Sequence, residues 1–299
     1  MEKYSLNSTT SLIVNPKFPN CNSLLIEDEK TALVDAGLSG DHIKTILKEI
    51  KIDILINSHT HPDHVAANYM ISETTSAIIY VPEQEKGNTL SLKAMEKSFG
   101  VLGQAVEPSW EKIVVDLIGF KASGRETTYG DGHIFDLGEN QMEGIHTPGH
   151  SAGHNCFLFR GKDIFFASDL GIDSFGPWYG YLDSNLNDYI KSINKIKKFD
   201  IKRTISSHEN DYIYNIGERL NKSLDIINQR RTKIIELLKE GPKDINQLIQ
   251  SNIIYFNLDK FSSPMLDFLL FFEGNMIKEH LKNLIESGEI SEKKGLYHY

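Results

Sequence analysis

The sequence has only two cysteines in 299 residues, too few for the disulfide framework of a small secreted domain. No apolar run approaches the ~20 residues that a membrane-spanning helix needs. The N-terminus has no basic segment followed by a long apolar one, which disfavours a signal peptide. These absences predict a cytoplasmic protein without a membrane anchor. We expect Cys21 and Cys156 to be small, buried side chains.

Basic residues are also too few to favour a polyanionic partner. Lys and Arg number 32 against 41 Asp and Glu, which gives a net charge of −9. Residues 216–299 hold 12 charges of each sign, so the whole net charge belongs to residues 1–215. Because phosphate backbones are bound by clusters of Lys and Arg, this composition disfavours a nucleic-acid partner and favours a small-molecule substrate.

The densest cluster of chemically active side chains lies at residues 59–64, which read His-Thr-His-Pro-Asp-His. The apolar run 52–56, which is separated from this cluster by two residues, predicts a buried strand. Imidazole nitrogens and carboxylate oxygens are ligands that Zn²⁺ prefers. A strand that ends in such a cluster presents its ligands at a sheet edge, where they can converge while one position stays open for water. The segment therefore predicts a metal site.

This H-x-H-x-D-H run resembles the signature of the metallo-β-lactamase superfamily, and three later segments extend the resemblance. Residues 146–151, His-Thr-Pro-Gly-His-Ser, are similar to the family element whose second histidine binds metal. Residues 165–169 are similar to the strand whose last aspartate bridges two metals, and residues 205–208 to the strand that delivers the last histidine. The four segments occur in the family's order, and together they are far more specific than any one alone.

The resemblance implies an α/β (α+β) fold, a four-layer αββα sandwich, with a complete set of metal ligands. The implied ligands are His59, His61 and His150 for the first metal, Asp63, His64 and His208 for the second, and Asp169 as the bridge. The implied cofactor is two Zn²⁺, with iron or manganese as alternatives. His61 favours zinc, because the flavodiiron branch has a glutamate at that position. A hydroxide between the metals is the expected nucleophile, and Asp63 would also hold it or carry a proton to the leaving group.

Residues 1–215 are predicted to form the catalytic domain. Its sequence predicts a β-meander from residue 11 to residue 37, a helix at 41–51, and a helix at 182–199. We interpret residues 83–128 as an insertion over the site, with a helix at 90–99. Hairpin-like strands are expected around two turn-prone segments, 129–132 and 137–140.

Beyond residue 215 the pattern becomes helical, which predicts a second domain at 216–299. Helices are expected at 220–238, from 244, and at 275–287, followed by a small β-wing at 288–297. Three helices and a wing resemble a winged-helix module. A similar C-terminal module accompanies one branch of the superfamily, which includes an RNA endonuclease.

Two apolar segments are candidates for pocket walls. In the aromatic loop 175–181, we predict that Tyr179 or Tyr181 donates a hydrogen bond to a substrate carbonyl or oxyanion, with ordinary aromatic packing as the alternative. The run Phe268–Phe272 is the most apolar of the chain. It would form the contact between the two domains, a dimer interface, or an acyl-binding wall that reaches the site.

The leading hypothesis is a dinuclear zinc hydrolase that acts on a small carboxylic thioester, ester or lactone. Hydroxyacylglutathione hydrolase (glyoxalase II) is the analogue in reaction type. The alternative is a metal-dependent nuclease or phosphodiesterase that uses the C-terminal domain to hold nucleic acid. A third hypothesis is a non-catalytic ligand sensor. A homodimer is possible in each case.

Overall fold

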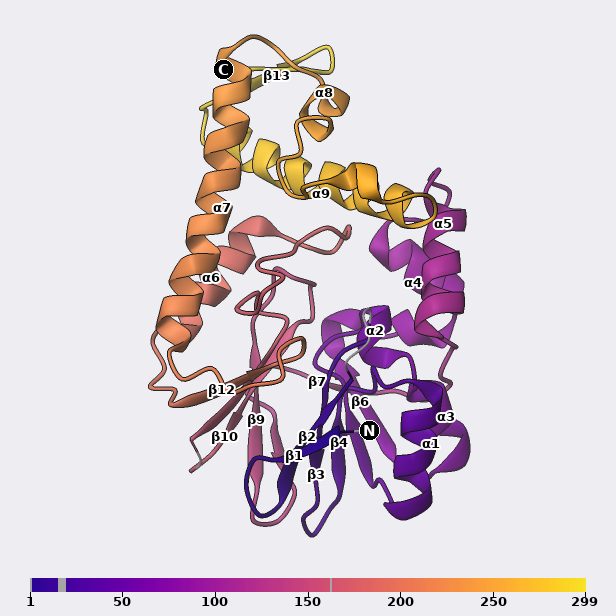
Figure 1. Cartoon of the computed structure of the whole chain (residues 1–299). Coiled ribbons are helices and arrows are strands. Elements are labelled where there is room, and N and C mark those ends of the chain that lie inside the picture. The colour runs from indigo at the N-terminus through magenta and orange to yellow at the C-terminus, as the bar shows by residue number, and fades with distance from the viewer. Residues whose placement is uncertain (1, 16–19, 162) are drawn as a thin grey trace.

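The computed structural model describes residues 2–15, 20–161 and 163–299, and its centre is a pair of sheets (Figure 1). The first sheet has seven strands in chain order, which are antiparallel from β1 to β4 and parallel from β4 to β7. The strands are β1 (Glu2–Ser5), β2 (Thr10–Val14), β3 (Ser23–Ile26), β4 (Ala32–Val34), β5 (Ile54–Ile56), β6 (Ile78–Pro82) and β7 (Thr127–Tyr129). The predicted meander is confirmed as β2 to β4, and β1 is an addition to it.

The second sheet has the strand order β12-β11-β10-β9-β8. Its strands are β8 (Ile134–Asp136), β9 (Gln141–His146), β10 (Asn155–Phe159), β11 (Ile164–Ser168) and β12 (Arg203–Ser206). The hairpin expected around 137–140 is confirmed by the antiparallel pair β8 and β9. The hairpin expected around 129–132 is wrong, because β7 pairs with β6 in the first sheet and β8 belongs to the second. This turn instead carries the chain from one sheet to the other.

The two sheets pack face to face and carry helices on their outer faces, which confirms the αββα arrangement. One apolar cluster lies between the sheets, with members such as Leu24 on β3 and Phe166 on β11. A second cluster joins the first sheet to its helices, and a third joins the second sheet to α6 and the C-terminal helices. Strands such as β2 are buried on both faces for this reason. The helices of the sandwich are α1 (Gly40–Glu49), α2 (Pro62–Val65), α3 (Asn68–Thr74) and α6 (Leu186–Ile196).

The insertion between β6 and β7 is mostly helical. It contains η1 (Glu83–Glu85), η2 (Asn88–Leu90), α4 (Leu92–Phe99), α5 (Glu107–Glu111) and η3 (Lys112–Ile118). The indole of Trp110, on α5, is completely buried in a cluster with Phe99 and Phe272. The insertion therefore packs against the C-terminal part of the chain, as well as on the sandwich.

The C-terminal elements are α7 (Ile216–Lys239), α8 (Ile245–Ile249), η4 (Leu258–Lys260), α9 (Met265–Glu286), β13 (Ser291–Lys293) and β14 (Leu296–His298). The helix expected from Asn275 begins ten residues earlier and takes in the whole run Phe268–Phe272. In Figure 1, α9 crosses above the sandwich toward α4 and α5. The domain boundary and the winged-helix likeness stay predictions. Across the described ranges, no helix has the length and apolarity needed to cross a membrane.

Candidate metal centre and pocket

The metal-ligand residues are presented by loops and by the short helix α2 at one end of the two sheets. Residues 57–61 follow β5 and lead into α2. The segment after β4 packs so closely against α2 that only glycine fits at position 37. A Cβ atom at Gly37 would lie 1.9 Å from the carbonyl oxygen of Asp63. Asp35, just after β4, has a φ of 58°, a left-handed conformation that side chains other than asparagine and aspartate seldom adopt. The backbone next to the ligands is therefore tightly packed at Gly37 and left-handed at Asp35.

The structure brings all seven predicted metal ligands together, in two groups. His59, His61 and His150 form one group, and Asp63, His64, Asp169 and His208 form the other. Within each group the ligand atoms lie within 4.8 Å of one another. The carboxylate of Asp169 joins the groups, because its Oδ2 lies 3.5 Å from His150 Nε2 and 3.3 Å from His208 Nε2. This geometry matches two neighbouring sites that share one carboxylate.

Three of the imidazoles have their tautomer fixed by a partner on the far side of the ring. The Nδ1 of His64 lies 2.9 Å from the Asp35 carboxylate, and that of His150 lies 2.9 Å from the Trp178 carbonyl. Both partners can only accept a hydrogen bond, so Nδ1 donates and Nε2 is the nitrogen that remains for a metal ion. The Nδ1 of His59 lies 3.0 Å from Ser58 Oγ, which itself donates to Asp35. Ser58 can accept from His59, which assigns the same tautomer there.

The imidazole nitrogens that face the ligand groups make few hydrogen bonds in the part of the chain that the structure describes. The Nε2 atoms of His59, His61, His64 and His150 are buried without a hydrogen bond from any described residue. Burial and the neighbouring imidazoles hold the pKa values of His59 and His61 well below the usual range, and burial lowers the pKa of His150 to about 4. His59, His61 and His150 are therefore neutral, and their buried Nε2 atoms without a hydrogen bond cost free energy unless something binds them. The residues present therefore fit metal ions of the kind that prefers nitrogen and oxygen ligands.

The acidic residues of the second group counterbalance its histidines. Although burial opposes it, the positive charges of His64 and His208 hold the pKa of Asp169 well below its usual range. Burial likewise opposes a charge on His208, yet the Asp169 carboxylate raises the pKa of His208 to about 9. Burial raises the pKa of Asp63, which is the more exposed of the two carboxylates. The two carboxylates and two imidazoles of the second group thus offer the oxygen and nitrogen ligands that a divalent cation such as Zn²⁺ prefers.

The other histidines near the motif have structural roles. His154 Nε2 accepts a hydrogen bond from the backbone N–H of Asp169, at 3.0 Å, and so orients the bridging residue. His146 Nε2 instead lies 2.8 Å from the Ala152 carbonyl oxygen. Of the three histidines at 146, 150 and 154, only His150 reaches a ligand group.

Sequence reasoning missed three supporting residues, Asp35, Ser58 and Glu85. Asp35 accepts from Ser58 N, Ser58 Oγ and His64 Nδ1, at 2.7, 2.8 and 2.9 Å. Glu85 accepts from Thr60 N at 2.5 Å and from Gly153 N at 2.8 Å, which ties the two histidine loops together. The available signal was weak, since each is a single carboxylate or hydroxyl beside an apolar strand.

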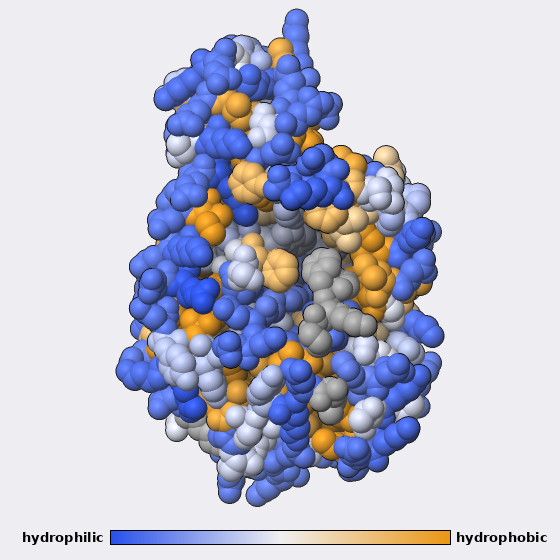
Figure 2. All heavy atoms as spheres, viewed as in Figure 1, coloured by the Kyte–Doolittle hydropathy of each residue, from blue (hydrophilic) through white to orange (hydrophobic). Residues whose placement is uncertain are grey.

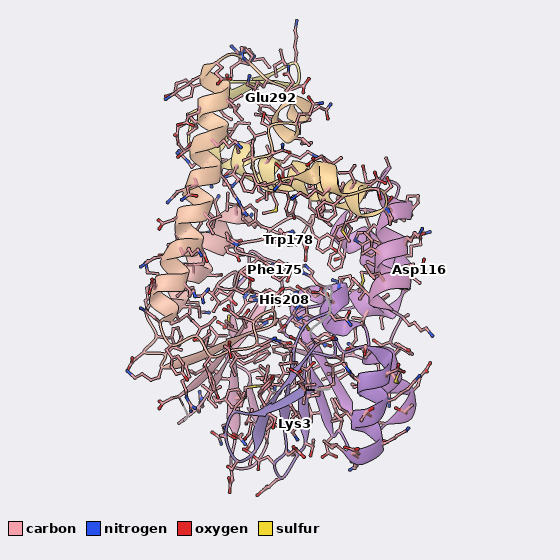
Figure 3. All side chains as sticks on the ribbon, viewed as in Figure 1. Lys3, Asp116, Phe175, Trp178, His208 and Glu292 are labelled. Carbon is pink, nitrogen blue, oxygen red and sulfur yellow. The ribbon has the colours of Figure 1, made fainter. Side chains whose placement is uncertain are left out.

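A pocket of about 430 Å³ opens onto both ligand groups. Figure 2 shows a hollow between the C-terminal helices and the sandwich, and in Figure 3 Trp178, Phe175 and His208 lie there one below another. Among the described residues that line it, there is no Lys or Arg. The lining residues are His61, Pro62, Asp63, Ile113, Ile118, His150, Asp169, Gly171, Asp173, Phe175, Gly176, Trp178, Tyr181, His208, Tyr255, Phe256, Leu258, Phe261, Met265, Phe268 and Leu269.

The two candidate tyrosines lie in different environments. Tyr181 lines the pocket, with its ring 4.8 Å from that of His61, and its oxygen accepts from Trp110 Nε1 at 3.2 Å. Tyr179 is fully buried behind the pocket, where its hydroxyl lies 2.8 Å from His280 Nε2 and 3.1 Å from the Arg230 guanidinium. The structure therefore does not bring Tyr179 to the ligand groups, because its hydroxyl is taken up by α7 and α9.

The sandwich and its two ligand groups define a metallo-hydrolase type of site, and comparison with known proteins gives the family. The family model described as the metallo-beta-lactamase superfamily matches residues 16–208. The chain belongs to this superfamily, which confirms the resemblance seen in the sequence.

Individual relatives are distant. The chain is 29% identical over 150 residues to a hydroxyacylglutathione hydrolase from Rhizobium etli, a match that covers 49% of this chain and 46% of that protein. It thus spans about half the length of this relative. It is 26% identical to a probable metallo-hydrolase from Methanocaldococcus jannaschii, over 67% of this chain and 90% of that one.

Solved structures resemble the chain over almost its whole length. A metallo-beta-lactamase family protein from Thermus thermophilus matches with a TM-score of 0.74 and 18% identity, and covers 98% of this chain and 99% of its own. A beta-lactamase domain protein from Burkholderia ambifaria matches with a TM-score of 0.76 and 16% identity, over 99% and 93%. At these identities the likeness shows the fold, which here includes the C-terminal helices.

Proposed function

We propose that the protein is a dinuclear zinc hydrolase that cleaves a carboxylic thioester, ester or lactone. The observation that carries the proposal is the set of buried Nε2 atoms without hydrogen bonds near Asp169, in a cluster whose members His61 and His150 line the pocket. His59, His61 and His150 would hold one metal, Asp63, His64 and His208 the other, and Asp169 both. Bound there, the metal pair would supply a hydroxide nucleophile at neutral pH and draw charge from the attacked carbonyl oxygen.

The chain's own residues supply orientation and proton handling. Tyr181 is a candidate donor to the substrate oxygen, because Trp110 already fills an acceptor position of its hydroxyl and leaves the Tyr181 hydrogen for another partner. Burial raises the pKa of Tyr181 far above the ordinary value, so the phenol keeps that proton. Asp63, at the pocket floor, would carry a proton to the leaving group through its carboxylate.

The pocket favours a carboxylic substrate over a phosphodiester. Nucleic acids and nucleotides carry phosphates that proteins bind with Lys and Arg, and no described residue of the pocket lining is either. A curated relative is named a hydroxyacylglutathione hydrolase and another an atrochrysone carboxyl ACP thioesterase, and both names refer to thioester chemistry. The nuclease alternative has no observation of this kind in its favour.

The test is metal content by mass spectrometry combined with hydrolysis of a substrate panel. The panel contains S-lactoylglutathione, acyl-CoA thioesters, an acyl-homoserine lactone, bis-p-nitrophenyl phosphate and a structured RNA. We expect about two zinc ions per chain and turnover of thioester or lactone, which His59→Ala abolishes. Turnover of the phosphodiesters alone would refute the proposal in favour of a nuclease. Iron in place of zinc would refute the assignment of the metal.

A further inference from the structure

The C-terminal part of the chain supplies one continuous apolar side of the pocket. We call residues 255–269 the roof segment; it contains the end of the loop after α8, η4 and the first turn of α9. The pocket residues that it contributes are Tyr255, Phe256, Leu258, Phe261, Met265, Phe268 and Leu269. Apart from the Tyr255 hydroxyl, these side chains are hydrocarbon or thioether, so the wall offers almost no polar contact.

The roof segment is held in place by buried polar contacts. Glu273 on α9 is fully buried, and its carboxylate accepts from the backbone N–H groups of Ile253, Ile254 and Tyr255, at 2.8, 2.9 and 2.8 Å. The Tyr255 hydroxyl in turn accepts from Trp178 Nε1 at 2.7 Å. Three charge-assisted bonds to consecutive backbone groups fix the start of the segment on α9. The wall is therefore preorganised relative to the ligand groups.

The rim of the pocket leaves large apolar side chains uncovered. Phe175 is 61% exposed, Phe256 69% and Phe261 45%, although all three line the same pocket. Across from the roof, Ile113 and Ile118 of η3 continue the apolar lining. An exposed apolar surface that is concave and continuous with a reactive centre is suited to an apolar ligand. The acidic side chains at the floor, Asp63 and Asp173, disfavour a ligand that carries negative charge there.

We propose that the roof segment is an acyl-binding wall, and that the substrate's acyl part is an apolar chain of medium length. This inference rests on the proposed function, because it assumes that the scissile carbonyl lies at the two ligand groups. The chain would then run from the metal centre along Met265, Phe268 and Leu269 toward the aromatic rim. The run Phe268–Phe272, for which the sequence left three possibilities open, would serve as this wall through its first two residues.

Burial of hydrocarbon sets the size of the effect. Each methylene transferred from water to the wall should raise kcat/KM about fourfold, until the pocket is filled. The test uses N-acetylcysteamine thioesters with acyl chains from acetyl to dodecanoyl, because the leaving group then stays constant. We expect the octanoyl thioester to exceed the acetyl thioester by at least ~100-fold, less than the full product of six methylene steps because burial is incomplete.

A pair of neighbouring residues gives a matched control. Leu269→Asp places a carboxylate in the wall, whereas Leu270→Asp makes the same change one residue further along α9, outside the lining. Leu270 is 37% exposed, so the control variant should fold. We expect Leu269→Asp to lower the octanoyl-to-acetyl ratio of kcat/KM at least tenfold, and Leu270→Asp to leave the ratio as it is. An equal effect of both variants, or a ratio near one in the unaltered protein, would overturn the proposal.

A binding measurement separates the wall from the chemistry. Tryptophan fluorescence, with Trp178 in the pocket, should report titrations with the uncharged butanamide, hexanamide, octanamide and decanamide, whether or not any thioester is cleaved. Binding that strengthens about fourfold per methylene, without turnover of any ester, would refute the proposed hydrolase and retain the acyl site. Turnover with no dependence on chain length in either assay would refute the acyl site and retain the hydrolase.

Discussion

Replacement of Asp35 by asparagine should weaken one metal site selectively. Asp35 is fully buried and accepts three hydrogen bonds, from Ser58 N, Ser58 Oγ and His64 Nδ1. Asparagine has nearly the same shape and tolerates the φ of 58° at this position. Its amide nitrogen, however, is a donor and cannot accept from His64 Nδ1. Either this bond is lost, or His64 changes tautomer and points a hydrogen at the metal centre.

Two independent considerations give the size of the effect. Loss of a buried hydrogen bond to a charged group costs about 1.5–3 kcal/mol. Replacement of a group that orients a metal-bound histidine usually costs about 10–100-fold in metal affinity, which corresponds to about 1.4–2.7 kcal/mol. His64 belongs to the group with Asp63, Asp169 and His208. With its oxygen at the Oδ1 position, the asparagine can still accept from the backbone N–H of Ser58, which holds the loop that carries His59. The Ser58 hydroxyl shares the altered position with His64 Nδ1 and can turn to accept from the new amide.

The assay is zinc competition with a chromophoric chelator, followed by metal content after dialysis at low free zinc. We expect Asp35→Asn to bind its weaker zinc about 10–100-fold less tightly and to retain close to one zinc per chain instead of two. The matched control is Asp41→Asn, which removes an exposed carboxylate at the first turn of α1, and should retain both. Two zincs with unchanged affinity in Asp35→Asn would refute the assignment of the His64 tautomer. Loss of both zincs would refute the independence of the two groups.

Three further predictions concern the pocket and its supports. Tyr181→Phe should lower kcat by ~10²-fold with little change in KM, because its hydroxyl would stabilise the developing oxyanion. Tyr179→Phe alters a hydroxyl behind the pocket and should lower only the Tm. Equal effects of the two variants on kcat would contradict this assignment. Burial and the carboxylate of Glu111 raise the pKa of Glu96 from its ordinary 4.5 to about 7, so the folded state retains this proton and loses stability as pH rises from about 5 to 7. Glu96→Gln cannot ionise, so its Tm relative to that of the unaltered protein should rise as the pH increases between those values. A Tm difference that does not change with pH would refute the raised pKa of Glu96. Glu273→Gln should lose about 1–3 kcal/mol of stability in urea unfolding, because an amide cannot accept all three backbone N–H bonds, and no loss would refute its role as the anchor of the roof.

The metal ligands could be predicted from the sequence because they stand close together after apolar strands. His59, His61, Asp63 and His64 lie within six residues, and the later ligands each follow a strand of the second sheet. Strand ends of a sandwich meet at one edge, so a local pattern is enough to bring such side chains together. The supporting residue Asp35 has no such pattern, because its partners come from the loop after β5 and from α2, and only the fold brings them close.

Other features escaped prediction because a sequence pattern had two structural solutions. The turn 129–132 has the composition of a hairpin, yet competition between two sheets separates β7 from β8. Tyr179 and Tyr181 are equivalent in the sequence, and only the path of an irregular loop decides that one faces the pocket and the other α9. The start of α9 was missed because its first turns carry apolar residues on more than one side, which hides the helical period.

That failure of periodicity has a physical cause that bears on function. A helix with one buried face shows an apolar stripe, whereas the start of α9 serves two apolar environments. Phe272 packs with Trp110 and Phe99 in a closed core, while Phe268 and Leu269 face the open pocket. A wall of this kind must be stabilised by its own anchors, since solvent reaches one side, and Glu273 supplies three hydrogen bonds at that point. Burial of the Glu273 carboxylate costs free energy. We infer that this cost is offset because Glu273 fixes the position of the roof segment, and with it the shape of the wall that would select the acyl group.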